Sequence, residues 1–367
     1  MISFSVLLII LLGHAYFNMN RKIITNRLFL WIIGLIWLAL TLDIVSVLLN
    51  NPNFKQFIVL HKLVNIIGYI VSPCILYVGH IFNREWFNRY HREKIKVNYI
   101  LLLPLFINGI ATLLSHNESG LFYITSNNIY ERGTLFFILP CVSYFYFVYN
   151  LYFMYKQRKK FAERELVIFS LFYIVPAVFT ILQLINSNYF TIWSSAAIVI
   201  VITYIFILND QSHRDSLTGL ENHLSYEHYA QNIDDKKHNK LFMIYIDIDE
   251  FKTINDLYGH CEGDEAIKEF SNVLVESFLM THKKLIRLGG DEFLIILEER
   301  QSEKVETYIQ NLTKNLEAYN NIGKKPYNLK FSYGMVCYTN EYETLYELLD
   351  QADQLMYEQQ QSRRLRV

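Results

Sequence analysis

The chain has 367 residues, of which 52% are hydrophobic and 19% are charged, and its formal net charge is −1. A chain this long and apolar is not expected to form a single soluble domain, so part of it should lie in a membrane. Nothing in this balance suggests a nucleic-acid partner, and none is expected. The cysteines lack the spacing of a zinc site or a disulfide framework. They are Cys74, Cys141, Cys261 and Cys337.

The N-terminal part of the chain contains seven apolar stretches, each about long enough to cross a bilayer as a helix. We therefore predict an all-α, seven-helix transmembrane bundle over residues 1–208, acting as a sensor domain. The stretches cover about residues 2–17, 28–49, 58–82, 98–115, 135–155, 166–186 and 190–208.

Basic residues gather after the first, third and fifth stretches, whereas the loops after the second, fourth and sixth nearly lack Lys and Arg. The positive-inside rule then places the N-terminus outside and the C-terminus in the cytosol, in agreement with an odd number of spans. The prediction is a multi-pass protein of a bacterial plasma membrane, in contact with its lipids. A cleaved signal peptide is the alternative for the first stretch, but that stretch lacks a basic segment before its apolar core.

Asp43 lies near the outer end of the second stretch, where a carboxylate at membrane depth is a candidate functional group. It could pair with His61 or Lys62, or it could simply reach the interface. The outer loop over residues 115–134 is too short for a folded ectodomain. A sensed ligand, whose identity the sequence leaves unknown, is therefore expected between the helices or at their outer mouth. The number and order of the spans resemble the seven-helix sensor regions of bacterial histidine kinases and cyclases.

A short linker, residues 209–214, leads to a soluble domain predicted over residues 215–367. Within it, residues 240–246 form a compact apolar run that predicts a central buried strand. Asp247 and Asp249 follow directly, and the period of two in a strand places both side chains on one face.

A second acidic pair lies at a predicted hairpin. Apolar runs flank Gly289 and Gly290, which predicts a tight turn, and Asp291 and Glu292 follow at once. Glycine leaves room for a phosphate to approach the backbone, and carboxylate oxygens suit Mg²⁺. An ordinary acidic hairpin turn is the alternative explanation of these four residues alone.

Two further polar residues, Asn255 and Asp264, lie at predicted helix ends around the loop that contains Gly259 and His260; the second helix is expected to open at Gly263. An amide paired with a carboxylate can read a guanine, because the carboxylate accepts from N1–H and the exocyclic amine. Helix capping is the competing explanation, and it suits Asp264 well.

Several motifs in register over about residues 213–366 resemble the GGDEF family. The resemblance implies a palm-like α/β fold, with a mostly antiparallel central sheet flanked by helices, and diguanylate cyclase activity. The motifs are Asp215 to Asn222, Asp247 to Asp256, Gly259-His260, Gly263-Asp264, Arg287 to Phe293, Ser332-Tyr333-Gly334 and Ala352 to Tyr357.

The resemblance assigns roles to individual positions. Asp247, the Ile248 carbonyl, Asp291 and Glu292 match the metal-binding positions, which hold two Mg²⁺ per site, with Mn²⁺ as an alternative. The catalytic set is then Asp291, Glu292, Asp247 and Lys252, and the GTP-binding set is Asn255, Asp264, His260, Phe251, Gly289, Gly290 and Arg364. The family's reaction joins two GTP held by two facing domains, so it implies a homodimer.

Two departures from the family pattern stand out. Gln360 takes the place of a Lys that contacts the phosphates, and an amide cannot neutralise a phosphate. Met280 and Lys283 take the places of the Arg and Asp of the family's inhibitory product site, so we expect no product inhibition there. The alternative function is a catalytically weak or idle receptor that binds GTP or a partner protein.

Overall fold

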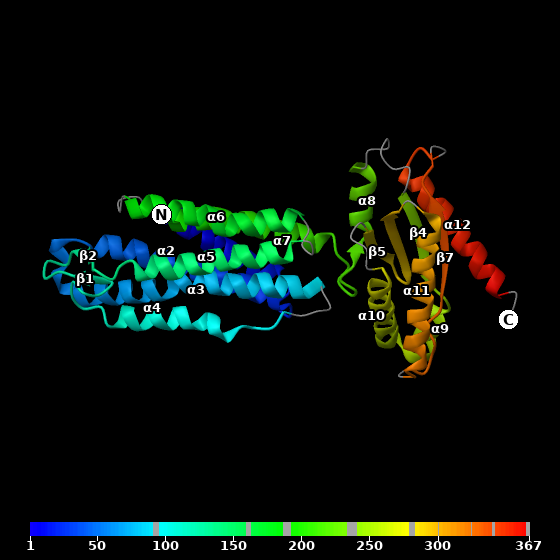
Figure 1. Ribbon diagram of the computed structural model, residues 1–367, viewed down its shortest axis with the longest axis horizontal. Helices are drawn as coiled ribbons and strands as arrows, with labels where there is room; N and C mark the ends of the chain where they lie inside the picture. The colour runs from blue at the N-terminus through cyan, green and yellow to red at the C-terminus, as the bar shows by residue number, and fades with distance from the viewer. Residues whose placement is uncertain are drawn as a thin grey trace. The chain divides into compact units, whose positions relative to one another are not determined.

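The computed structural model describes residues 1–90, 95–158, 163–185, 192–232, 241–278, 283–299, 301–323, 325–339 and 342–364. The chain divides into two compact units, Met1–Leu208 and Asn209–Val367. The first is a bundle of helices with a small antiparallel hairpin, β1 (Phe122–Ile124) and β2 (Tyr130–Arg132), at one end (Figure 1). The helices are α1 (Ile2–Asn18), α2 (Ile24–Leu49), α3 (Ile58–Tyr90), α4 (Leu103–Leu113), α5 (Ile138–Gln157), α6 (Glu163–Ile185) and α7 (Ile192–Ser212), with short 3-10 turns η1 (Pro52–Phe57) and η2 (Tyr99–Leu102).

Four helical segments in the described part of the chain are long and apolar enough to cross a membrane: Ile24–Leu49, Pro52–Asn88, Glu163–Gln183 and Ile192–Ser212. Helices α1 and α4 are shorter than the rest. Helix α5 is long enough, but its tyrosines and Asn150 lower its mean hydropathy. The N-terminal unit is therefore helical with four candidate membrane spans, and seven spans remain a prediction.

Of the alternatives for Asp43, the pairing with His61 is not formed among the described residues. His61 is fully buried, and its ring nitrogens lie 3.0 Å from Asn128 Oδ1 and 3.3 Å from Ser46 Oγ. Both nitrogens thus have partners on other elements. Among the described residues no ion pair joins Asp43 to His61 or to Lys62, and Asp43 instead lines a cavity.

The second unit is an α/β domain with a mixed, mostly antiparallel sheet, as predicted (Figure 1). The strand order is β3-β5-β6-β4-β7, with β3 parallel to β5 and the other neighbours antiparallel. The strands are β3 (Glu221–Asn222), β4 (Leu241–Ile248), β5 (Lys283–Gly289), β6 (Glu292–Glu298) and β7 (Phe331–Cys337). The helices are α8 (His223–Asn232), α9 (Phe251–Tyr258), α10 (His260–Ser277), α11 (Ser302–Asn321) and α12 (Leu345–Arg364).

The alternation of apolar side chains along β4 builds two cores, one on each face of the sheet. Ile244 and Ile246 pack with residues of α10 and α11, whereas Met243 and Tyr245 pack with residues of α8 and α12. Asp247 continues the second series, because side chains two residues apart point to the same face. The end of β4 therefore presents its first acidic side chain toward α12.

Candidate active site

Glycine in the turn between β5 and β6 is explained by the backbone conformation and not by a lack of space for a side chain. Gly290 has a φ of +51°, a left-handed value that favours glycine. A Cβ added at Gly289 or Gly290 would meet no atom within 4 Å. The backbone of this turn is thus open to an approaching group, which is what a phosphate needs.

The register of the sheet brings the acidic residues of the two motifs together. Asp247 lies opposite Glu292 in the β4–β6 ladder, and the Ile248 N–H donates to the Asp291 carbonyl at 3.3 Å. Burial, followed by the charges of Asp291, Glu292 and Asp249, raises the pKa of Asp247 to about 7. Burial also raises the pKa of Asp291. The carboxylates are thus close enough to repel one another.

The donor set fits Mg²⁺ held jointly with a nucleotide rather than in a closed cage. Within the described residues no group of three or more His, Cys, Asp or Glu side chains surrounds a common point. Mg²⁺ in nucleotide sites commonly takes only one or two carboxylates, with phosphate and water oxygens for the rest. Asp247, Asp291, Glu292 and the Ile248 carbonyl offer such oxygens, and a cation would relieve the repulsion at Asp247.

The C-terminal end of α12 contacts Asp247 and Asp249, the two aspartates at the end of β4. Gln360 Nε2 donates to Asp247 Oδ1 at 2.9 Å, and Arg363 Nη1 lies 3.3 Å from Asp249 Oδ2. Ser332 Oγ donates to Asp249 Oδ1 at 2.7 Å. The resemblance to the family predicts Gln360 near the phosphates, whereas in the structure Gln360 contacts Asp247. These partners are more than eighty residues from the aspartates in the chain, so no local pattern marks them.

A glycine fixes how closely α12 approaches the sheet. A Cβ added to Gly334 of β7 would lie 1.9 Å from the Ala352 carbonyl oxygen and 2.5 Å from the Met356 nitrogen. Both atoms belong to the α12 backbone and cannot step aside as a flexible side chain would. Gly334 therefore allows α12 to dock where Gln360 reaches Asp247.

Arg287 links the β5–β6 turn to the start of the domain, a role that was not predicted from the sequence. Its guanidinium donates to both carboxylate oxygens of Asp215, at 2.9 and 3.1 Å, and to the Gly290 carbonyl at 2.7 and 3.0 Å. Asp215 also accepts from the backbone and hydroxyl of Thr218. An arginine two residues before the glycine pair was the available signal.

The proposed guanine-reading residues lie on α9 and α10. A Cβ added at Gly263 would lie 2.0 Å from Asn255 Oδ1 and 3.3 Å from Phe251 Cζ, so this glycine lets the two helices meet around Asn255. The prediction that the second helix opens at Gly263 is wrong, because α10 begins at His260, directly after Gly259 with its φ of +85°. Asp264 therefore lies inside α10, and capping does not explain it.

Most of the remaining predicted residues are exposed or half-buried. Lys252, His260 and Asp264 are exposed, Phe251 is half-buried and Glu292 lies at the start of β6. Tyr245 lies near Glu292 and was not predicted as part of the site. Its burial, and then the charge of Glu292, raises the pKa of Tyr245. Arg364 is the last residue of α12 and its side chain is outside what the structure describes, as is Met280; Lys283 begins β5.

Comparison with known proteins assigns the second unit. Residues 212–366 match the family described as "Diguanylate cyclase, GGDEF domain". The chain is 30% identical over 175 residues to diguanylate cyclase A of Treponema denticola, covering 44% of this chain and 47% of that protein. It is 30% identical over 106 residues to an uncharacterized membrane protein of Staphylococcus aureus, covering 28% of this chain and 30% of that one.

Among solved structures, the GGDEF domain of the Pseudomonas aeruginosa protein TpbB, or YfiN, is 26% identical, with a TM-score of 0.37. That match covers 41% of this chain and 90% of the solved one. The chain spans about half the length, or less, of the curated relatives above.

Proposed function

Since residues 212–366 form a GGDEF domain, we propose that the protein is a diguanylate cyclase, bound to a membrane, that makes cyclic di-GMP and pyrophosphate from two GTP. The observation that supports this best is the acidic group at the end of β4. Asp247 faces Glu292, and burial and neighbouring charges raise the pKa of Asp247 to about 7, beside an open glycine turn.

The chain's own groups would act mainly by positioning and by charge. Asn255 and Asp264 would bind the guanine, and the open backbone at Gly289 and Gly290 would admit the triphosphate. Mg²⁺ held by Asp247, the Ile248 carbonyl, Asp291 and Glu292 would supply charge neutralisation at the phosphates. Lys252 and Arg364 would add positive charge near the triphosphate, with His260 and Phe251 at the rim.

Each domain would hold one GTP, and the 3′-oxygen of one nucleotide would attack the α-phosphate of the other. A new P–O bond forms, pyrophosphate leaves and the hydroxyl proton is released; a second such step closes the ring. One domain carries half of the reacting groups, so the active species would be a homodimer.

Control would come from the helical unit, which we place in the plasma membrane of a bacterium with the N-terminus outside and the cyclase domain in the cytoplasm. Helix α7 is continuous from Ile192 to Ser212, across the boundary between the units at residue 208. A shift of this helix would therefore reach Asp215 through very few residues.

A second candidate function is a receptor that binds GTP with little or no turnover. The contact between Gln360 and Asp247 favours it, because an uncharged amide occupies one metal-ligand oxygen and supplies no charge to a phosphate.

The test uses the full chain in lipid nanodiscs with GTP and Mg²⁺, and product separated by chromatography. We expect cyclic di-GMP from the wild type and none from Asp291→Ala. GTP binding without product would select the receptor. Product from Asp291→Ala would show that the proposed site is not the active one.

A further inference from the structure

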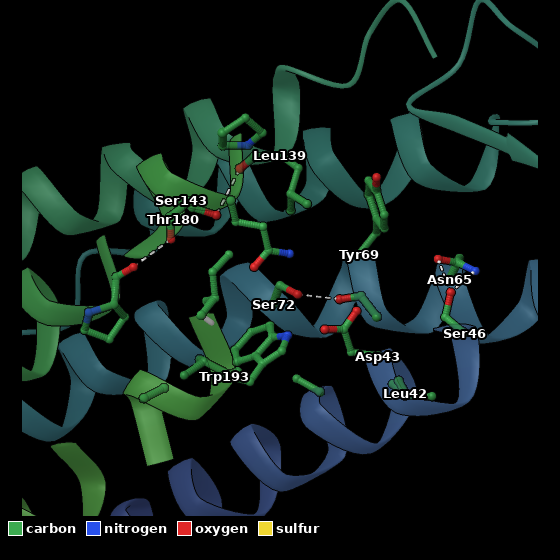
Figure 2. A pocket seen from close by; sticks show the side chains of 18 of the residues that line it. Leu42, Asp43, Ser46, Asn65, Tyr69, Ser72, Leu139, Ser143, Thr180 and Trp193 are labelled. Atoms are coloured by element: carbon green, nitrogen blue, oxygen red, sulfur yellow. Dashed lines mark hydrogen bonds between the residues drawn. The ribbon is translucent and has the colours of Figure 1, made fainter. Parts of the chain in front are cut away.

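The helical unit contains a cavity of about 660 Å³ that the proposed cyclase chemistry does not use. Helices α2, α3, α5, α6 and α7 line it together with β2, and Figure 2 shows Asp43, Ser72, Ser143, Thr180 and Trp193 around it. Sites for small molecules typically have volumes of about 300–1,000 Å³. The volume alone is thus sufficient for a small organic ligand.

Three charged side chains line the cavity: Asp43, Glu131 and Arg132. Arg132 donates to the Gln183 carbonyl at 3.4 Å and lies over the Phe136 ring, and Glu131 accepts from the Tyr123 hydroxyl. Asp43 has no hydrogen bond or ion pair to any described residue. A carboxylate at this depth without a partner is costly, and a positive charge would offset that cost.

The uncharged groups on the wall point to the same chemistry. The hydroxyls of Ser72, Ser143 and Thr180 each donate to a backbone carbonyl of their own helix, at 2.6, 2.9 and 2.8 Å (Figure 2). Gln183 Oε1 is buried and has no hydrogen-bond partner within the described chain. The wall therefore offers a ligand the acceptor oxygens of these hydroxyls and of Gln183, which a protonated amine, with its donors and its charge, satisfies.

We propose that this cavity binds a small organic amine in its protonated form. The ammonium group pairs with Asp43 and donates to further acceptors of the wall such as Gln183 Oε1. The carbon skeleton packs against aromatic side chains that line the same cavity, among them Phe147, Phe172 and Trp193. This binding does not depend on the proposed cyclase activity.

Calorimetry on the full chain in lipid nanodiscs tests the proposal with matched probes: butylamine, 2-phenylethylamine and tryptamine, each against the alcohol of the same skeleton. We expect at least one amine to bind at least about 10-fold more tightly than its alcohol, a difference set by the charge. Asp43→Asn should weaken that amine by about 30-fold or more, as loss of one partner of a buried charge pair does.

Matched variants separate charge from folding. Asp43→Glu keeps the charge and should keep the preference for amines. Thr41→Ala, on the same helix but outside the cavity wall, removes a hydroxyl that is bonded to the Trp37 and Leu38 carbonyls, and it should bind normally. If Asp43→Asn does not fold, Gln183→Leu serves in its place, with an expected loss of about 5-fold. The proposal is overturned if no amine binds better than its alcohol, which would indicate an apolar or lipid occupant. Unchanged amine affinity in the folded variant would overturn it too.

Discussion

The candidate active site has two parts that are held in place in different ways. In the acidic part, strand register sets Asp247 against Glu292, and Gln360 from α12 bonds to Asp247. In the part that we propose binds guanine (the guanine part), Asn255 is positioned by the packing of α9 against α10 at Gly263. Backbone ladders tolerate little displacement, whereas a side chain between helices can shift. The acidic part should therefore govern turnover and the guanine part substrate affinity.

One substitution in each part tests whether the acidic part governs turnover and the guanine part governs affinity. Asp247→Asn keeps the shape but removes the charge, and we expect kcat to fall by about 1000-fold, the upper range for loss of one electrostatic group. Asn255→Ala should instead raise KM for GTP by about 10-fold with a smaller change in kcat. Steady-state kinetics of the full chain checks both. The division fails if Asp247→Asn changes only KM.

A pair of glycine substitutions sharpens the same contrast. Gly334→Ala places a Cβ against the α12 backbone, so we expect a loss of stability of about 3 kcal/mol. Gly263→Ala meets the Asn255 side chain, which can move, so it should raise KM with a much smaller loss of stability. Calorimetric unfolding and GTP titration of both variants distinguish these effects. Equal destabilisation by the two would show that Asn255 is as firmly held as α12.

Sequence patterns predicted the parts of the domain whose causes are local. The apolar run before Asp247 forms β4, and the alternation of β4 directs Asp247 as expected. The β5–β6 turn lies at Gly290 and Asp291, one residue later than the glycine pair predicts, because Gly289 is still part of β5. Contacts made by distant segments were missed, because Gln360 reaches Asp247 only after α12 docks at Gly334.

The helical unit shows the limit more clearly. The lengths of the apolar stretches predicted where its helices lie. Helix α5 forms as predicted, but its tyrosines make it less hydropathic than a candidate membrane span. The cavity around Asp43 is built by five helices and β2, so no single stretch of sequence could indicate it.

Arg287 links the acidic part to the beginning of the domain. Its replacement should reduce stability less than Gly334→Ala does. Arg287→Ala removes the partly buried contact of Nη1 with both Asp215 oxygens and the two bonds from Nε and Nη2 to the Gly290 carbonyl. We expect a loss of about 2 kcal/mol at pH 7. Arg287→Lys should recover little of this, because an ammonium cannot reproduce the fork. Full recovery by Lys would show that only charge matters.

The same contact gives a pH dependence of stability. Burial alone would raise the pKa of Asp215, but hydrogen bonds from Thr218 and Arg287 outweigh it and leave that pKa below its ordinary value of 3.8. Such a carboxylate stabilises the fold above its unfolded pKa and loses this contribution as the pH falls through the folded one. Calorimetric unfolding between pH 6 and about pH 3 should show a steeper fall in the wild type than in Arg287→Ala, mostly below about pH 4. Parallel curves would contradict this assignment.

The smallest expected effect is that of replacing Gln360, which should increase kcat/KM. Gln360→Lys replaces a neutral donor to Asp247 by a charged one and adds a positive charge beside the proposed phosphate site. A charge-assisted hydrogen bond is about twice as strong as a neutral one, so kcat/KM should rise by about 5-fold. Gln360→Ala serves as the control, because it frees Asp247 without adding charge and should not increase turnover. If Gln360→Lys lowers kcat/KM while Gln360→Ala raises it, the contact with Asp247 is inhibitory. Turnover is then limited by access to the Asp247 carboxylate and not by a missing positive charge.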